Sequence, residues 1–296
     1  MAKNHVSPNK KEDSMKIEYT TFSEAGTRPY NEDYIRIVEI PEQDRTLFVL
    51  CDGMGGHAMG DLASHTVGDV FANYWQKKPE FKDCEKKVRE VCHKASVAID
   101  RTSFDMGHVQ MGTTMVMASI EGKKVAIAHV GDSRCYLLRK GFSDWEKFAE
   151  TADVSYVESD IVYQTQDHVN LQFGWETVAK CFFSYRPEVA VPDISEFEIQ
   201  PGDVIFLCSD GVNKYVRPDI MKDRLLDDRT PEQIADFIRR PYRSIWVKFI
   251  FLGIIMYNNN ILMSRFSNLL FNFAEDFLMA SLQISAYWSS ESEIFM

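Results

Sequence analysis

Three times in this sequence an apolar run stops at an aspartate beside a glycine, and this repeated ending constrains the fold more than any other feature. The runs are LFVLCDG, VAIAHVGD and VIFLCSDG, and their aspartates are Asp52, Asp132 and Asp210. Runs of this kind are typical of buried strands, so each aspartate is expected at the rim of a sheet, where side chains from neighbouring strands converge. The adjacent glycine lets the backbone come close enough for a carbonyl to act as a ligand. The alternative at each site is a simple Asp-Gly turn.

A fourth acidic point, Glu32 with Asp33, lies just before a strand-like stretch from Tyr34 to Val38. Clusters of oxygen donors suit hard cations such as Mg²⁺ or Mn²⁺ rather than zinc. Arg28 stands four residues ahead of Glu32 in the string RPYNED, and its planar guanidinium suits a phosphate held over such ions. For an isolated arginine, a surface role is the alternative.

Periodicity elsewhere predicts strands grouped with strands and helices grouped with helices. Apolar residues at helical spacing predict helices over 61–75 and 85–101, and an N-cap, an N1 proline and a capping-box partner predict a helix over about 231–240. The predicted strands are 16–22, 46–51, 114–120, 124–130, 134–139, 161–164, 197–199 and 204–208. The three between 114 and 139 predict an antiparallel meander. The whole pattern predicts an α+β fold with antiparallel sheets.

Composition excludes several classes of protein. The 296 residues are 45% hydrophobic and 26% charged, which argues against disorder and against a membrane protein. The net charge of -11 argues against a nucleic-acid partner, because phosphate binding needs clustered Lys and Arg. The six cysteines form no C-x-x-C pair, and Cys51, Cys135 and Cys208 are expected as buried free thiols. The N-terminus lacks the apolar stretch of a secretory signal, so a cytoplasmic location is expected.

The distribution of charge predicts three segments. Residues 1–14 are polar and are expected to form a mobile leader. Residues 15–240 carry the motifs, whereas residues 241–296 form an atypical hydrophobic tail with only three basic and four acidic residues. The longest apolar stretch of the tail, Ile245–Tyr257, is short of the roughly 20 residues that span a bilayer. An appendage that packs on the domain or lies on a membrane surface is one reading of the tail, and an out-of-frame or replaced ending is the other.

Six motifs in order resemble those of the metal-dependent serine/threonine protein phosphatases of type 2C, in their bacterial form. They are RPYNED at 28–33, DGMGGHAMGD at 52–61, GTT at 112–114, VGDSR at 130–134, QDH at 166–168 and SDGV at 209–212. The resemblance covers residues 15–240 and implies a four-layer α-β-β-α sandwich of two antiparallel sheets flanked by helices. It also implies hydrolysis of phosphoserine and phosphothreonine on proteins by a water activated between two metal ions.

The resemblance assigns roles to residues one by one. Asp52 would bridge two Mn²⁺ or Mg²⁺ ions, Gly53 would offer its carbonyl, and Asp210 would bind one ion. Glu32 and Asp33 would act through water molecules, Asp132 would serve a third metal position with Asp210, and Arg28 would bind the substrate phosphate. The implied partners are a phosphoprotein substrate and a cognate kinase; the sequence predicts no oligomeric state.

The sequence departs from the family pattern in two places. Met54 stands where animal members have a histidine after the Asp-Gly, and His57 is the nearby candidate for a general acid, with water as the alternative donor. No Asp-Asn pair follows Arg240, so a further metal ligand is absent and the last family strand is expected to be missing or replaced. These departures leave a second hypothesis open, an inactive phosphatase-like module that binds phosphoproteins or regulates a partner.

Overall fold

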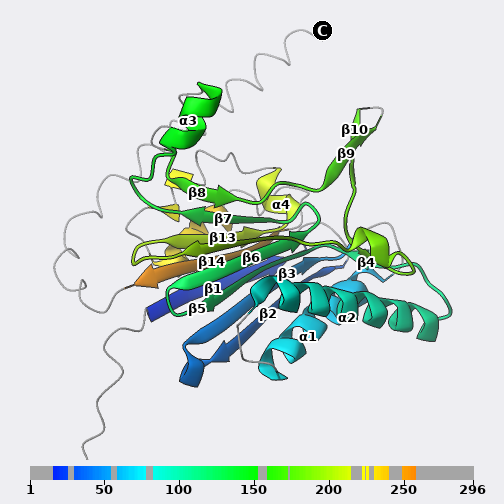
Figure 1. Cartoon of the computed structure of the whole chain (residues 1–296). Helices are drawn as coiled ribbons and strands as arrows, with labels where there is room; N and C mark the ends of the chain where they lie inside the picture. Colours follow the sequence, from blue (N-terminus) through cyan, green and yellow to red (C-terminus); the bar gives the residue numbers. More distant parts are fainter. Residues whose placement is uncertain are drawn as a thin grey trace, which may run out of the picture. The chain divides into compact units, whose positions relative to one another are not determined.

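Two five-stranded antiparallel sheets organise the chain in the computed structural model (Figure 1). The structure describes residues 16–25, 30–54, 59–77, 83–152, 159–172, 174–214, 222–223, 225–226, 230–239 and 249–257. All of these belong to one compact unit, Met1–Asn258, whereas the expected leader and the second unit, Asn259–Met296, lie outside the described residues.

The first sheet has the order β12-β6-β5-β3-β2 and the second the order β1-β14-β13-β7-β8. The strands of the first sheet are β2 (Asp33–Ile40), β3 (Arg45–Asp52), β5 (Met115–Glu121), β6 (Lys124–Val130) and β12 (Asp193–Glu198). Those of the second sheet are β1 (Lys16–Glu24), β7 (Arg134–Leu138), β8 (Ile161–Gln164), β13 (Val204–Cys208) and β14 (Phe249–Tyr257). Most of the predicted strands are therefore confirmed, with ends that differ by a few residues.

The apolar runs that end in aspartate are strands buried on both faces. Along β3, Phe48 and Leu50 pack between the sheets, whereas Leu47 and Val49 pack on the other face against the helices. The strand β13 alternates in the same way between the layer shared by the sheets and the outer face of the second sheet. A strand covered on both sides needs apolar residues at every position, which explains the unbroken runs. The predicted burial of Cys51, Cys135 and Cys208 is confirmed.

Helices cover the outer face of each sheet and complete the four layers. Helices α1 (Gly60–Lys77) and α2 (Cys84–Asp105) pack together on the first sheet, as Figure 1 shows. Helix α6 (Pro231–Arg239) packs against β1 and β14 of the second sheet. Its predicted capping box is present, since the Gln233 amide donates to Thr230 Oγ1 at 3.4 Å and the Thr230 amide donates to Gln233 Oε1 at 3.1 Å. The predicted α-β-β-α sandwich is confirmed.

Two expectations need correction. The predicted meander is wrong in its last strand, because β5 and β6 pair in the first sheet whereas β7 pairs with β13 in the second. The last strand is also not missing. Strand β14, which comes from the segment read as a tail, lies between β1 and β13, so the sheet extends beyond the expected boundary at residue 240. The structure thus has a strand at this place in the second sheet, formed by residues after Arg240.

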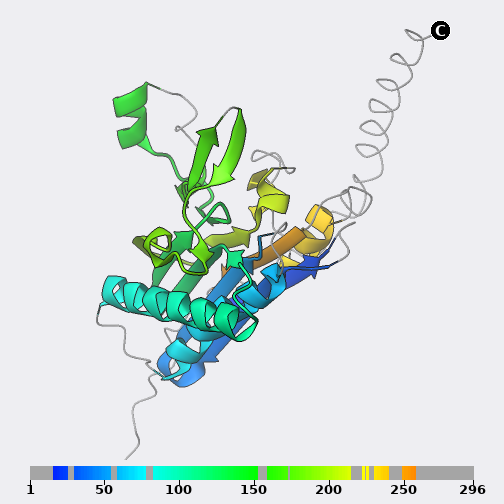
Figure 2. The same cartoon turned by 90° about the vertical axis from the view of Figure 1, so that its right-hand side faces the viewer.

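The remaining elements are short strands and helices outside the two main sheets. Strands β9 (Val169–Gln172) and β10 (Trp175–Val178) form a hairpin that projects away from the sheets (Figures 1 and 2). Strand β4 (Gly112–Thr113) pairs with β11 (Phe182–Phe183), and α3 (Trp145–Thr151) and α4 (Asp210–Asn213) are single short helices. Among the described residues, no helix has the length and apolar character to cross a membrane.

Candidate metal centre

Four acidic side chains from separate parts of the chain line one pocket of about 930 Å³. They are Glu32, Asp52, Asp132 and Asp210, and we refer to them as the pocket carboxylates. Asp52 ends β3, Asp210 directly follows β13 and Ser209, and Asp132 lies in the connection between β6 and β7. The expected convergence at the rims of the two sheets is therefore observed, and Gly53 lies on the same pocket wall.

The backbone around Gly53 is too crowded for any other residue. A Cβ atom at this position would lie 2.2 Å from the Gly60 carbonyl oxygen and 2.5 Å from the Glu32 carbonyl oxygen. The Gly53 amide donates to that Glu32 oxygen at 3.0 Å, and Ser64 Oγ donates to it at 2.7 Å. Glycine thus lets the end of β3 lie against Glu32 and the start of α1, which holds Glu32 and Asp52 on one side of the pocket.

Asp33 has a different position from the other predicted acidic residues. It lies opposite Asp52 in the register of β2 and β3 and is 6% exposed, but it is not among the residues that line the pocket. The structure therefore places it beside Asp52, on the neighbouring strand of the first sheet. Its role through water molecules stays a prediction.

The turn at Gly131 carries Asp132 from the first sheet to the second. Gly131 has a φ of 121°, and a Cβ atom there would lie 2.6 Å from Thr114 Cβ. The hydroxyls of Thr114 and Ser133 are 2.8 Å apart, and the Thr114 amide donates to the Asp52 carbonyl at 2.9 Å. The GTT and VGDSR motifs thus hold Asp132 beside Asp52 through backbone and hydroxyl contacts.

The QDH motif braces this turn from the other side. The Gly131 amide donates to His168 Nδ1 at 3.1 Å, and His129 Nε2 contacts the Gln166 carbonyl oxygen at 2.8 Å. Arg134 binds Asp167 through two hydrogen bonds of 2.7 and 2.8 Å. Each residue of the motif therefore fixes one part of the 129–134 segment. In the sequence this motif was only part of the family resemblance, whereas the structure shows which residues it contacts.

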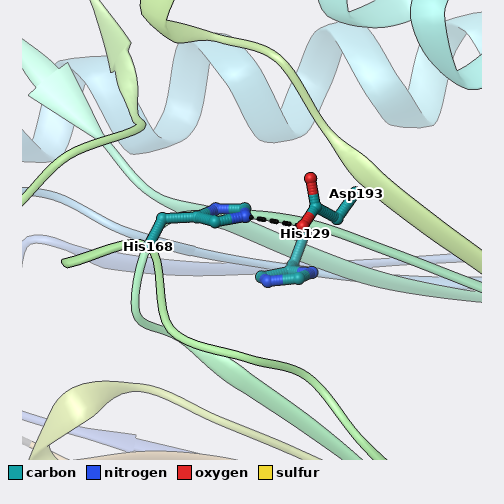
Figure 3. A group of neighbouring side chains, drawn as sticks. All are labelled: His129, His168 and Asp193. Atoms are coloured by element: carbon teal, nitrogen blue, oxygen red, sulfur yellow. Dashed lines mark ion pairs between the residues drawn. The ribbon is translucent and has the colours of Figure 1, made fainter.

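A second cluster lies beside the Gly131 turn and is made of His129, His168 and Asp193 (Figure 3). We refer to it as the histidine cluster. Its possible ligand atoms lie within 4.8 Å of one another, and the two rings stack at 4.4 Å. His168 Nε2 lies 3.0 Å from Asp193 Oδ2, as the dashed line in Figure 3 marks. Lys180 Nζ lies 2.8 Å from Asp193 Oδ1 and 3.2 Å from His168 Nε2, so an ammonium already balances the carboxylate, and the cluster reads as a hydrogen-bond network.

Asp210 begins α4, and two residues on its C-terminal side contact the Asp132 segment. Asn213 Nδ2 donates to the Asp132 carbonyl oxygen at 3.0 Å. Lys214 Nζ lies 2.8 Å from Asp210 Oδ2 and 3.7 Å from Asp132 Oδ2. Sequence reasoning missed both residues. The position of Lys214, four residues after Asp210, was the available signal for its one-turn contact with that carboxylate.

The pocket carries a surplus of negative charge. Burial, followed by repulsion from Asp210 and Asp52, raises the pKa of Asp132 from 3.8 to about 6, although Lys214 opposes the shift. Carboxylates that share one pocket and repel one another are stabilised by a cation that neutralises them, and an all-oxygen donor set suits Mg²⁺ or Mn²⁺. The residues present therefore fit the metal centre expected from the sequence.

The two remaining predicted site residues, Arg28 and His57, lie outside the described residues. The pocket wall does contain another arginine, Arg186, whose Nε lies 2.9 Å from Glu188 Oε1. Sequence reasoning missed Arg186 because it lies in the region 142–192, where no pattern gave guidance. The hairpin β9–β10 adds Asn170 and Thr177 to the same wall.

Comparisons with known proteins agree with this geometry. Residues 32–150 match the family model described as protein phosphatase 2C. The serine/threonine phosphatase stp of Listeria monocytogenes is 28% identical over 224 residues, which cover 71% of this chain and 82% of that protein. The serine/threonine protein phosphatase PstP of Mycobacterium tuberculosis is 27% identical over 212 residues, which cover 71% of this chain and 39% of that protein.

Solved structures of the same type share the fold. The phosphatase Stp1 from Staphylococcus aureus superposes with a TM-score of 0.61 at 22% identity, covering 86% of this chain and 99% of that one. The catalytic domain of PstP in complex with 2 manganese ions gives a TM-score of 0.59 at 20% identity, covering 82% of this chain and 100% of that one. The motifs and the match over residues 32–150 make the chain similar to the protein phosphatase 2C family, and its sandwich is the fold of the solved phosphatase structures.

Proposed function

We propose that this chain is a serine/threonine protein phosphatase that depends on Mn²⁺ or Mg²⁺. The proposal rests mainly on one observation. Four carboxylates line one pocket at the rims of both sheets, namely Glu32, Asp52, Asp132 and Asp210. The family match and the named phosphatases among the relatives support the reaction class. The PstP structure with manganese supports the choice of metal.

The proposal gives the predicted site residues the following tasks. Asp52 would hold two ions, the Gly53 carbonyl and Asp210 would each hold one, and Glu32 and Asp33 would act through water molecules. When bound, the ions would activate a water for attack on phosphorus and neutralise the developing charge. The two sheets, the Gly131 turn and α4 keep these side chains in place before substrate arrives.

Substrate would be bound by the remaining pocket wall. Arg28 and Arg186 would contact the phosphate, because a guanidinium pairs well with phosphate oxygens. His57 is the candidate proton donor to the leaving oxygen, with water as the alternative. The hairpin β9–β10 carries Leu171 and Trp175, which are 74% and 77% exposed and available to a peptide substrate. A phosphoprotein and a cognate kinase are the partners we propose.

Two further expectations remain proposals. We place the chain in the cytoplasm, a choice supported by its six buried free cysteines. We also propose that the catalytic domain comprises residues 15–240 together with strand β14, which completes the second sheet.

The test uses the purified full chain, an aryl phosphate and a phosphothreonine peptide. Turnover should require Mn²⁺ or Mg²⁺, stop with chelator, and fall at least about 100-fold in Asp52→Ala and in Asp210→Ala. Asp105→Ala, at an exposed position of α2, is the control and should keep full activity. A full chain that binds the phosphopeptide but shows no turnover with either metal would favour the inactive module instead.

A further inference from the structure

Lys214 is the one described lysine that contacts two of the pocket carboxylates. Its ammonium nitrogen lies 2.8 Å from Asp210 Oδ2 and 3.7 Å from Asp132 Oδ2. These are the two side chains that the family resemblance assigns to a third metal position. A positive charge supplied by the protein therefore lies between the two carboxylates that such an ion would bind.

The surrounding structure holds Lys214 in this place. The residue directly follows α4, and its amide donates to the Asp210 carbonyl oxygen at 3.1 Å. Its neighbour Asn213 binds the carbonyl oxygen of Asp132 at 3.0 Å, so α4 and the Gly131 turn are linked beside the ion pair. The Lys214 side chain is 47% exposed, whereas that of Asp132 is 9% exposed. The ammonium thus approaches the buried carboxylate from the solvent side.

The contact between Lys214 and Asp132 offsets the negative charge of the pocket. Asp132 is repelled by Asp210 and by Asp52, and Lys214 is the neighbouring charge that attracts it. A divalent ion would coordinate carboxylate oxygens at about 2.0–2.1 Å for Mg²⁺. An ion that bridges Asp132 and Asp210 would have to displace an ammonium already paired with both, and the two like charges would repel each other.

We infer that Lys214 acts as a built-in cation that replaces a third divalent ion between Asp132 and Asp210. The inference rests on the proposed metal centre and adds a specific stoichiometry. The chain binds two ions through Asp52, Gly53, Glu32 and Asp210, and it leaves Asp132 paired with lysine. Lys214 is a specificity-determining residue for metal in this pocket.

The experiment is a Mn²⁺ titration of the metal-free full chain, with free Mn²⁺ followed by electron paramagnetic resonance and binding heats by calorimetry. The wild type should bind two ions. Lys214→Met, which removes the charge at similar side-chain length, should bind a third ion or bind its weakest ion about tenfold more tightly. Lys214→Arg keeps the charge and should match the wild type.

Two controls show whether a change in Mn²⁺ binding is specific to Lys214. The first tests the loss of a different lysine, and the second tests the effect on stability. Lys94 forms an ion pair with Glu90 four residues away on α2 and is 51% exposed, so Lys94→Met is a matched change remote from the pocket. It should leave Mn²⁺ binding unchanged. In chelator, Lys214→Met should unfold at a lower temperature than the wild type, because Asp132 and Asp210 lose their counter-charge. Added Mn²⁺ should raise its Tm more than that of the wild type.

The outcomes distinguish the two proposals. A wild type that binds two ions, with unchanged stoichiometry and affinity in Lys214→Met, would overturn the role of Lys214 and leave the metal centre standing. A wild type that binds three ions would overturn it as well. A wild type that binds no Mn²⁺ would contradict the proposed metal centre, and the inference would fall with it. If Lys214→Met does not fold, Lys214→Gln replaces it in the same titration.

Discussion

The pocket carboxylates and the histidine cluster lie on either side of the Gly131 turn, and they handle negative charge in opposite ways. In the pocket, burial and the neighbouring aspartates raise the pKa of Asp132 to about 6. In the histidine cluster, partial burial opposes the shift, yet hydrogen bonds from Lys180 and His168 lower the pKa of Asp193 to about 2. One cluster has more carboxylates than counter-charges, and the other is balanced.

This difference teaches how each cluster is used. A bound cation stabilises a cluster that has excess negative charge, whereas it stabilises a balanced and hydrogen-bonded cluster little. The histidine cluster instead holds the backbone of the turn, because His168 accepts a hydrogen bond from the amide of Gly131, the residue before Asp132. We therefore base the proposed metal centre on the balance of charge and not on the proximity of His and Asp side chains.

The largest difference between the two clusters is expected when one carboxylate charge is removed from each. Asp52→Asn should lower kcat with Mn²⁺ at least about 100-fold, because it removes a direct ligand, whereas Asp193→Asn should lower it less than about tenfold. Steady-state kinetics on an aryl phosphate measures both. Equal losses in the two variants would remove the distinction between them.

The second test uses pH in the absence of metal. The pKa of Asp132 is raised in the folded chain from 3.8 to about 6, so folding favours its protonated form. Its contribution to stability is present below about pH 4 and is lost as pH rises through about 6, by on the order of 2–3 kcal/mol. Urea unfolding in chelator should show this decline, and Asp132→Asn should remove it.

A matched variant makes the pH result specific. Asp105→Asn changes an exposed carboxyl of α2 and should keep the wild-type pH dependence. If Asp132→Asn also keeps it, then the pocket does not repel Asp132 in the way described.

The third test weakens the link between the two clusters. His168→Ala removes the acceptor for the Gly131 amide. The Gly131 turn lies against Thr114, whose amide donates to the Asp52 carbonyl oxygen, so the variant should weaken Mn²⁺ binding about tenfold, a typical cost of removing a group that orients a ligand. At saturating Mn²⁺, kcat should stay within a few-fold of the wild type. His93→Ala, at an exposed position of α2, is the control. Unchanged Mn²⁺ affinity in His168→Ala would show that Thr114 and Asp52 keep their places without the histidine cluster.

The smallest expected effect is at the far wall of the pocket. Arg186→Ala should raise KM for a phosphopeptide about two- to fivefold with kcat unchanged, because the side chain is 59% exposed and solvent screens its charge. The effect should shrink at high salt. A loss in kcat with unchanged KM would place Arg186 in the chemistry rather than in binding.

The acidic pocket was the most predictable part of the molecule. Asp52, Asp132 and Asp210 all follow apolar runs, and buried strands that end at one rim of a sandwich bring such residues together. Asp33 shows the limit of that reasoning, since it lies beside Asp52 in the register of β2 and β3 but is buried and does not line the pocket. The contact of Lys214 with Asp132 depends on how α4 packs on the Gly131 turn, which spacing along the chain does not reveal.

The fold was predictable as far as local pattern reaches. Alternation identifies a strand and its faces but not its partner, so the transfer of β7 to the second sheet was missed. Strand β14 was placed in an atypical hydrophobic tail because residues 241–296 carry few charges and no Asp-Asn pair. Its unbroken apolar run also has no period that distinguishes strand from helix. Its identity as a strand comes from pairing with β1 and β13, which are distant in the sequence.

The most direct measurement is the number of Mn²⁺ ions bound by the metal-free full chain, compared between wild type and Asp52→Asn, with Asp193→Asn as the matched change in the histidine cluster. We expect two ions in the wild type and in Asp193→Asn, and loss of at least one ion in Asp52→Asn. Unchanged binding in Asp52→Asn, or loss of binding in Asp193→Asn alone, would contradict the assignment of the metal centre to the pocket carboxylates.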